Sequence, residues 1–152
     1  METKTSFVPV LSIASGVKDI EFYKTAFGAV ELWQIKNQDD SVHVAAYSIN
    51  GNEFRLHEET KDGQNSSPGK VGSTTVTIGL RVEDVQAVVD GAVAAGVTVL
   101  SPITDYPYGY RQAELKDPFG HHWLIEKLIS KEALDSFLGA KDDIDDKELP
   151  GN

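Results

Sequence analysis

The side chains that could carry acid–base or metal chemistry in this sequence are mainly its histidines, at His43, His57, His121 and His122. Imidazole titrates near neutral pH and is a frequent metal ligand, so each could serve either purpose. Adjacent strand residues point to opposite faces, so His121 and His122 cannot readily chelate one ion together. We interpret these two as a turn residue and a strand-edge residue. The sequence has neither a Ser-His-Asp arrangement nor a phosphate-binding loop, so nucleophilic and nucleotide chemistry have no support.

The amino-acid composition excludes several classes of function. The 152 residues include no cysteine, so disulfides, thiolate nucleophiles and cysteine-ligated zinc are excluded. The 24 acidic and 14 basic residues give a net charge of −10, and without a basic cluster nucleic acid is not an expected partner. The acidity favours solubility or attracts a cationic ligand. Because there is no apolar run of about 20 residues and no signal-peptide pattern, we predict a cytoplasmic protein with no membrane partner.

The elements that must position these side chains begin with a predicted βαβββ module at residues 6–59. Apolar runs and alternation indicate strands at 7–13, 30–35, 42–49 and 53–58, with a helix at 17–27. Gly28 closes that helix, because glycine adopts the left-handed conformation without a Cβ penalty. Asn50 and Gly51 predict a tight hairpin turn, since both residue types tolerate positive φ.

A polar segment at 60–72 separates this module from a second one at 73–129. Because the segment is rich in Gly, Ser, Asn and Lys, it is predicted to be a mobile linker. The second module has expected strands at 74–82, 97–100, 110–116 and 121–128, a helix at 85–95 and a loop at 102–109. A last helix is predicted at 130–139 with Ser130 as its N-cap, followed by an acidic tail at 140–152 that we expect to be disordered.

The two modules repeat at an offset of 68 residues, which places Val85 over Val17 and Gly96 over Gly28. The order of elements and the spacing of the breaks agree, which indicates a duplication. We therefore predict an α+β fold with two tandem βαβββ modules, in a single domain over residues 1–140.

Three short motifs resemble those of a known family. Residues 20–28 are IEFYKTAFG, residues 82–85 are VEDV and residues 117–123 are DPFGHHW. They resemble signatures of the vicinal-oxygen-chelate superfamily, which includes glyoxalase I, bleomycin-resistance proteins and extradiol dioxygenases. The resemblance covers about residues 6–129 and is nearest to the PhnB-like branch of small single-domain members. It implies the glyoxalase/bleomycin-resistance fold, in which such modules form sheet-lined cups, and it implies a homodimer.

Metal-using members of this superfamily take two ligands from the first and last strands of each module. Counting from the motifs places Val8, Arg55, Thr77 and Leu124 at the four positions. Divalent cations need carboxylate, imidazole or similar donors, and an arginine would repel them. We therefore predict a protein that holds no metal at these positions and uses no cofactor.

The same positions imply which side chains face the cup, because strand residues alternate between faces. The loop and strand around Tyr108 are expected to close over it. The predicted ligand-binding residues are Arg55, His57, Thr77, Tyr110, Arg111, Glu114, His122 and Leu124. Since a guanidinium group holds a carboxylate bidentately, this set suits a small organic ligand that carries an anionic group.

Structural alternatives exist for several of these residues. Arg55 could pair with Glu53 or Glu114 instead of a ligand, and His57 could simply be exposed at the end of its strand. Phe54, Leu56, Trp123 and Ile125 are expected to face the core.

Three functions fit this inventory of residues. The first is metal-independent binding of a small organic molecule, as in the bleomycin-resistance proteins, which sequester a cationic drug. The second is a glyoxalase- or dioxygenase-type enzyme with unusual metal ligands, such as His43, His57, Glu114 or His122. The third is a metal-free lyase or isomerase with His57 or Glu114 as the acid or base.

Overall fold

The computed structural model describes residues 1–140, which form two four-stranded sheets with helices between and beside them. The first sheet has the order β1-β4-β3-β2 and the second the order β5-β8-β7-β6. The first module consists of β1 (Val10–Ile13), α1 (Phe22–Phe27), β2 (Val30–Lys36), β3 (Val42–Ile49) and β4 (Asn52–Glu58). The second consists of β5 (Thr77–Arg81), α3 (Val85–Ala94), β6 (Thr98–Asp105), β7 (Tyr110–Lys116) and β8 (His122–Leu128). The predicted α+β fold with two βαβββ modules is confirmed.

Each module has one parallel strand pair, β1–β4 or β5–β8, and its other neighbours are antiparallel. The β3–β4 turn has Asn50 at φ 47° and Gly51 at φ 81°, as a two-residue hairpin with two left-handed positions requires. Gly28 ends α1 at φ 65°. These breaks are therefore the ones that the local sequence predicts.

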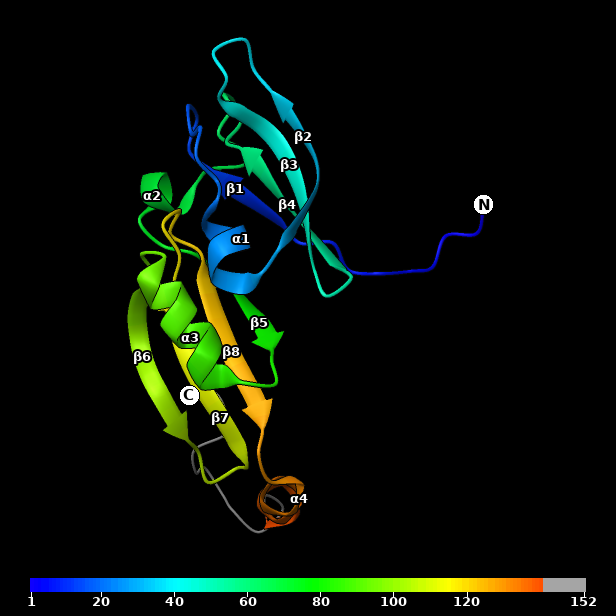
Figure 1. Cartoon of the computed structure of the whole chain (residues 1–152), viewed down its shortest axis with the longest axis vertical. Helices are drawn as coiled ribbons and strands as arrows, with labels where there is room; N and C mark the ends of the chain where they lie inside the picture. Colours follow the sequence, from blue (N-terminus) through cyan, green and yellow to red (C-terminus); the bar gives the residue numbers. More distant parts are fainter. Residues whose placement is uncertain (141–152) are drawn as a thin grey trace.

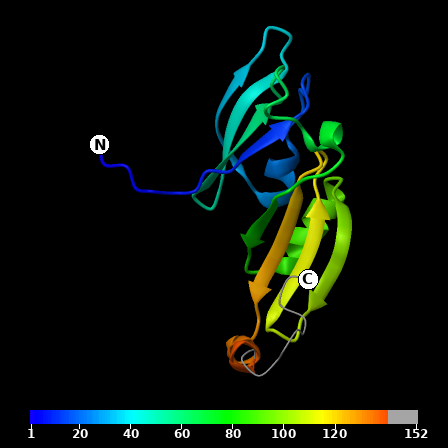
Figure 2. The same cartoon turned by 180° about the vertical axis from the view of Figure 1, so that it is seen from behind.

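The two modules lie one beyond the other along the long axis of the molecule, with α1 and α3 packed together where they meet (Figure 1). A Cβ on Gly91 of α3 would lie 3.7 Å from the carbonyl oxygen of Ala26, an ordinary van der Waals distance, so the two helices are in direct backbone contact there. Figure 2, the opposite view, shows the chain before β1 running away from both sheets, and α4 (Lys131–Ala140) at the far end of the second module.

An aromatic cluster, partly or fully buried, joins the two modules. Its rings, with centroid separations of 4.8–6.4 Å, belong to Tyr23, Phe27, Phe54, Phe119 and Trp123. The carboxylate of buried Asp117 accepts hydrogen bonds from the Tyr23 hydroxyl at 2.6 Å and from Trp123 Nε1 at 2.9 Å. Burial, followed by the charge of Asp117, raises the pKa of Tyr23 well above its usual value.

A second polar contact between the modules comes from the β7–β8 turn. Nε2 of His121, which is 7 % exposed, donates to the carbonyl oxygen of Ser12 in β1 at 2.7 Å. His121 is thus a turn residue with a structural role, as predicted.

The structure differs from the sequence-based prediction in four elements. The helix predicted at 17–27 begins only at Phe22, and the carbonyl oxygen of Val17 accepts from the nitrogen of Val42 instead. The strands predicted at 7–13 and 74–82 are shorter, β1 and β5. The loop predicted from Pro102 is part of β6, which tolerates proline because it is an edge strand with irregular register.

The segment at 60–72, predicted to be a linker, contains the short helix α2 (Pro68–Val71). Ser67 before it is buried and donates its hydroxyl to Glu59 Oε2 at 2.8 Å, while Pro68 packs against Gly120. These two contacts give the segment a local structure that its composition did not predict.

The last helix begins where the sequence predicts, because the hydroxyl of Ser130 accepts from the nitrogen of Ala133 at 3.0 Å. The tail predicted at 140–152 lies outside the described residues, apart from residue 140 at the end of α4. No helix within residues 1–140 is long and apolar enough to cross a membrane.

Candidate functional site

Each sheet packs one face against the helices and leaves the other face open. Phe54 and Leu56 of β4 are 5 % and 0 % exposed, and Trp123 and Ile125 of β8 are 1 % and 0 % exposed, so these side chains face the core as predicted. The residues between them in sequence therefore lie on the open faces, Arg55 and His57 in the first sheet, and His122 and Leu124 in the second.

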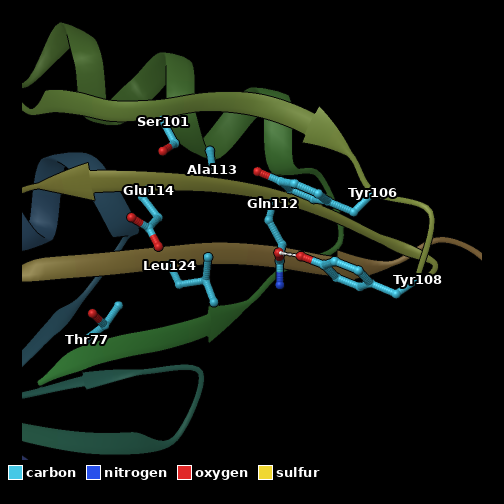
Figure 3. A pocket seen from close by; sticks show the side chains of 8 residues that line it. All are labelled: Thr77, Ser101, Tyr106, Tyr108, Gln112, Ala113, Glu114 and Leu124. Carbon is cyan, nitrogen blue, oxygen red and sulfur yellow. Dashed lines mark hydrogen bonds between the residues drawn. The ribbon is translucent and has the colours of Figure 1, made fainter. Parts of the chain in front are cut away.

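A cavity of about 350 Å³ lies on the open face of the second sheet (Figure 3). We call it the second-module pocket. Its lining comes from four strands and the β6–β7 turn, and consists of Thr77, Ser101, Tyr106, Tyr108, Gln112, Ala113, Glu114 and Leu124. Hydroxyl, amide and aromatic groups dominate this lining, which suits a small organic molecule.

Two stacked tyrosines form one end of the second-module pocket. The rings of Tyr106 and Tyr108 are 5.1 Å apart and inclined by 11°. Helix α4 supports them from outside, with Phe137 at 6.0 Å from the Tyr108 ring. Gly109, between the tyrosines and β7, has φ 91°, and a Cβ there would collide with the carbonyl oxygen of Ser130. The β6–β7 turn and the start of α4 therefore fit together only with glycine at this place.

A chain of hydrogen bonds holds Tyr108 in place. Its hydroxyl donates to Gln112 Oε1 at 2.6 Å, and Gln112 Nε2 donates to Glu126 Oε1 at 2.9 Å. Arg81 Nε donates to the other oxygen of Glu126 at 3.0 Å. Burial raises the pKa of Tyr108, and the nearby Tyr106, Glu126 and Glu114 raise it further. Tyr108 is therefore a neutral donor at physiological pH.

Glu114 is the charged group of the lining. It lies on β7 opposite Leu124 of β8, and its side chain points from the sheet into the pocket (Figure 3). Within residues 1–140 its carboxylate makes no hydrogen bond or ion pair to another side chain, in contrast to Glu126 on the same face. Its two oxygens are therefore available to a ligand.

In the first module, Arg55 has an internal partner. Its Nε and one terminal nitrogen both lie 2.9 Å from Glu53 Oε2, and its guanidinium carbon is 5.5 Å from the centroid of the Trp33 ring. Of the two partners considered from the sequence, Glu53 is therefore the one that binds it, and Glu114 lies in the other module. An anionic ligand would have to compete with Glu53 for this guanidinium.

Two histidines meet at the other end of the first sheet. The rings of His43 and His57 are 5.0 Å apart. His43 Nδ1 lies 2.8 Å from Glu58 Oε1, and His57 Nδ1 lies 2.6 Å from the carbonyl oxygen of Glu58. Since a carbonyl oxygen only accepts, Nδ1 of His57 is the donor in its contact with Glu58.

Comparison with known proteins agrees with this architecture. Residues 16–125 match the model of the Glyoxalase/Bleomycin resistance protein/Dioxygenase superfamily. An uncharacterized protein of Mycobacterium bovis is 35% identical over 135 residues, which cover 87% of this chain and 89% of that protein. The chain belongs to this superfamily.

Solved structures of the glyoxalase fold superpose on most of the chain. A gene product of Arabidopsis thaliana has a TM-score of 0.64 at 25% identity, and covers 82% of this chain and 100% of its own. TioX from a Micromonospora species has a TM-score of 0.62 at 22% identity, and covers 81% of this chain and 99% of its own. These likenesses support the fold.

The register of the strands relates the four positions, Val8, Arg55, Thr77 and Leu124, that the motif resemblance predicts for metal ligands. Arg55 pairs with Val10, two residues after Val8, and Leu124 pairs with Gly79, two residues after Thr77. The two pairs are thus equivalent in the two modules. Within residues 1–140, no group of three or more His, Asp or Glu side chains is placed to hold a metal ion.

The structure gathers only part of the predicted ligand-binding set. Thr77, Glu114 and Leu124 line the second-module pocket. Tyr110 and His122 share its open face outside the lining, and Arg55 and His57 belong to the other sheet. Arg111 is not brought into the site. It lies on the opposite face of β7 from Glu114, and its guanidinium holds Asp105 through two hydrogen bonds of 2.7 and 2.9 Å.

Four lining residues were missed from the sequence, namely Ser101, Tyr106, Gln112 and Ala113, and Tyr108 was expected only in the loop that closes over the cup. Gln112 could have been found, because it is two residues from Glu114 on the same strand and so shares its face. Ser101 required the pairing of β6 with β7, which places it opposite Glu114.

Proposed function

We propose that this protein binds a small organic molecule in the second-module pocket, without a metal ion. The observation that carries the proposal is the lining itself. The pocket lies over Thr77 and Leu124, at which metal-using relatives keep ligands, and these side chains offer no strong donor. Around them are hydroxyls, an amide, two aromatic rings and one carboxylate, which can orient an organic ligand by hydrogen bonds and stacking.

The open face of the first sheet supports a homodimer as the working form. Val10, Trp33 and Ile35 on β1 and β2 are 55%, 40% and 53% exposed, and Phe7 before β1 is 98% exposed. Apolar groups gathered in this way mark interaction surfaces. A second copy that laid its own sheet against this face would cover them and complete the cups. The resemblance of the motifs to the PhnB-like branch is in keeping with such a small paired protein.

A ligand screen tests the binding proposal. Metal-free protein is screened by melting temperature against small organic molecules and, separately, against divalent metals. A compound at about a hundred times its dissociation constant stabilises the fold by about 2.7 kcal/mol, which such a scan resolves easily. We expect organic compounds to raise the melting temperature and divalent metals to have no effect.

A pair of tryptophan variants then locates the binding. Leu124→Trp fills the pocket, whereas Leu128→Trp adds the same bulk to the same strand outside the lining. Compounds should lose their effect on the first variant and keep it on the second. Hits that bind both variants equally would place the ligand elsewhere and refute the proposal.

Metal-free acid–base catalysis is the second candidate, and it is favoured by the carboxylate of Glu114, which lies in a cavity and has no side-chain partner within residues 1–140. His57 belongs to the other sheet, so it does not act with Glu114 within one chain. If a bound compound is converted, Glu114→Gln should abolish turnover and retain binding of a neutral compound. Recovery of every compound unchanged after incubation with the protein would leave binding as the function.

A further inference from the structure

The charges around the second-module pocket favour one sign of ligand. Glu114 is the one charged residue among its lining residues. Two arginines of the same sheet already form ion pairs. Arg81 pairs with Glu126 at 3.0 Å, and Arg111, which lies on the opposite face, pairs with Asp105 at 2.7 Å. A cationic group on a ligand would therefore meet a carboxylate that no side chain of residues 1–140 neutralises.

One lysine shares the open face with Glu114. Lys116 lies two residues further along β7, opposite His122, and lines a separate hollow beside α2. It is therefore beyond the end of the pocket that lies away from the tyrosines. The pocket between Glu114 and the tyrosines holds no cation of its own within the described chain.

The tyrosine end offers a second type of contact for a cation. Aromatic faces attract cations within about 6 Å of the ring centre, and more strongly where water is excluded. Tyr106 and Tyr108 stand as a stacked pair on the same side of the sheet as Glu114 (Figure 3). The hydroxyl of Tyr108 is engaged by Gln112, and α4 supports its ring through Phe137. The rings are thus positioned before any ligand arrives.

The charge nearest this end has the same preference. Burial is the main cause of the raised pKa of Tyr108, and the nearby Tyr106, Glu126 and Glu114 raise it further. Burial disfavours a charge of either sign, but the carboxylate of Glu114, which has no side-chain partner within residues 1–140, favours a cation. The net charge of −10 adds a long-range attraction for positively charged molecules.

We propose that the ligand of the second-module pocket is an organic cation. Its positively charged nitrogen, as an amine or an N-alkylated heteroaromatic ring, lies between the carboxylate of Glu114 and the rings of Tyr106 and Tyr108. This inference rests on the proposed function. It replaces the sequence-based expectation of a ligand with an anionic group, because Arg55 and Arg111, on which that expectation depended, both form ion pairs outside this pocket.

Three probes of one bicyclic shape separate charge from size: 1-methylquinolinium, quinoline and quinoline-2-carboxylate. Their dissociation constants for the full chain are measured by calorimetry at a pH at which quinoline is neutral. The cation should bind about tenfold more tightly than quinoline, because it adds a cation–π contact and an ion pair with a carboxylate to the contacts that both probes make. The carboxylate should bind more weakly than quinoline. Raising the salt concentration to about 0.5 M should narrow the gap between cation and neutral probe.

Two charge-matched variants identify the group responsible. Glu114→Gln should remove most of the preference, about five- to tenfold, and leave the affinity for quinoline unchanged. Glu31→Gln makes the same change of net charge on β2, outside the pocket, and should keep the preference. Tyr106→Leu should weaken the binding of 1-methylquinolinium more than the binding of quinoline, because leucine has no aromatic face.

The outcomes distinguish this inference from the proposed function. If quinoline binds as tightly as 1-methylquinolinium and Glu114→Gln changes neither dissociation constant, the proposal of a cationic ligand is refuted, while the proposal of binding in the pocket stands. Failure of all three probes also refutes the cation. If, in addition, the melting screen yields no compound that Leu124→Trp blocks, the proposed function fails with it.

Discussion

Asp117 is the residue at which removal of a single charge should do most damage to the junction between the modules. It is 3 % exposed, and its carboxylate receives four hydrogen bonds. Oδ1 accepts from the backbone nitrogens of Phe119 and His121 at 2.8 and 3.0 Å, and Oδ2 accepts from Tyr23 and Trp123. The first pair forms the β7–β8 turn, and the second ties that turn to Tyr23 of α1 and to Trp123 of β8.

Asp117→Asn retains the shape of the side chain and replaces one oxygen with a donor. If the new amide keeps its oxygen toward the turn, its nitrogen faces the hydroxyl of Tyr23 and the indole of Trp123. The hydroxyl can rotate to accept, but the indole can only donate and loses its partner. One buried unsatisfied donor costs about 1–3 kcal/mol, and the loss of charge weakens the remaining bonds. We therefore expect destabilisation by about 2–4 kcal/mol.

The assay is equilibrium unfolding in urea, read by tryptophan fluorescence and by circular dichroism. Tyr23→Phe is the matched comparison, because it removes one hydrogen bond and leaves the carboxylate with three, at a cost of about 1–2 kcal/mol. The double variant should show a coupling energy of about 0.5–3 kcal/mol, since the two groups are in contact. A loss below about 0.5 kcal/mol for Asp117→Asn would refute the reasoning that this carboxylate holds the junction together.

Three further predictions concern the same structure. The raised pKa of Tyr23 means that its hydroxyl resists ionisation in the folded protein. Its contribution to the free energy of unfolding is therefore full below the usual pKa of 10.0 and is lost as the pH rises above that value. Tyr23→Phe should flatten the alkaline limb of a plot of the free energy of unfolding against pH. Arg55→Ala should cost less than about 1 kcal/mol in urea unfolding, because its side chain is 41% exposed and its pair with Glu53 is near the surface; a larger loss would show that the pair is structural. Gly109→Ala should lower the free energy of unfolding by at least about 2 kcal/mol, because alanine is strained in the left-handed backbone and its Cβ would collide with Ser130, and it should also weaken ligand binding. Gly63→Ala is the control, because Gly63 has φ 74° but lies in open space, so that alanine there causes the backbone strain alone.

The dimer proposed for the working form is tested by light scattering. At about 100 μM the full chain should have twice the mass of one chain, since stable dimers dissociate at far lower concentrations. Trp33→Glu would place a charge on the open face of the first sheet and should produce monomers. A monomer mass for the unmodified chain at that concentration would contradict the proposal.

Local sequence determined the elements and their faces. The strands predicted at 42–49 and 110–116 are β3 and β7 at the predicted bounds, because alternation along a strand is a property of neighbouring residues. The same alternation placed Trp123 in the core and Leu124 on the open face. Asn50 and Gly51 predicted their turn from their own conformational preferences.

Tertiary contacts decided the start of α1 and the fate of the charged residues. Residues 17–21 have a helical pattern, but the carbonyl oxygen of Val17 is taken by Val42, far along the chain. The partner of Arg55 was left open between Glu53 and Glu114, and the arrangement of the two modules chose the one on its own strand. Propensity cannot report the start of α1, because it depends on a group that is distant in sequence, and it cannot exclude Glu114 as a partner of Arg55, because that requires the placement of the two modules.

The sequence by itself thus determined the duplicated βαβββ architecture and the superfamily. Only the tertiary structure showed that the pocket belongs to the second sheet and that Glu114 is its charged group. The physical reason is that a pocket requires side chains from several strands at once. The pairing of β6 with β7 and the docking of α4 behind Tyr108 are long-range contacts, and they set both the walls and the charge of the site.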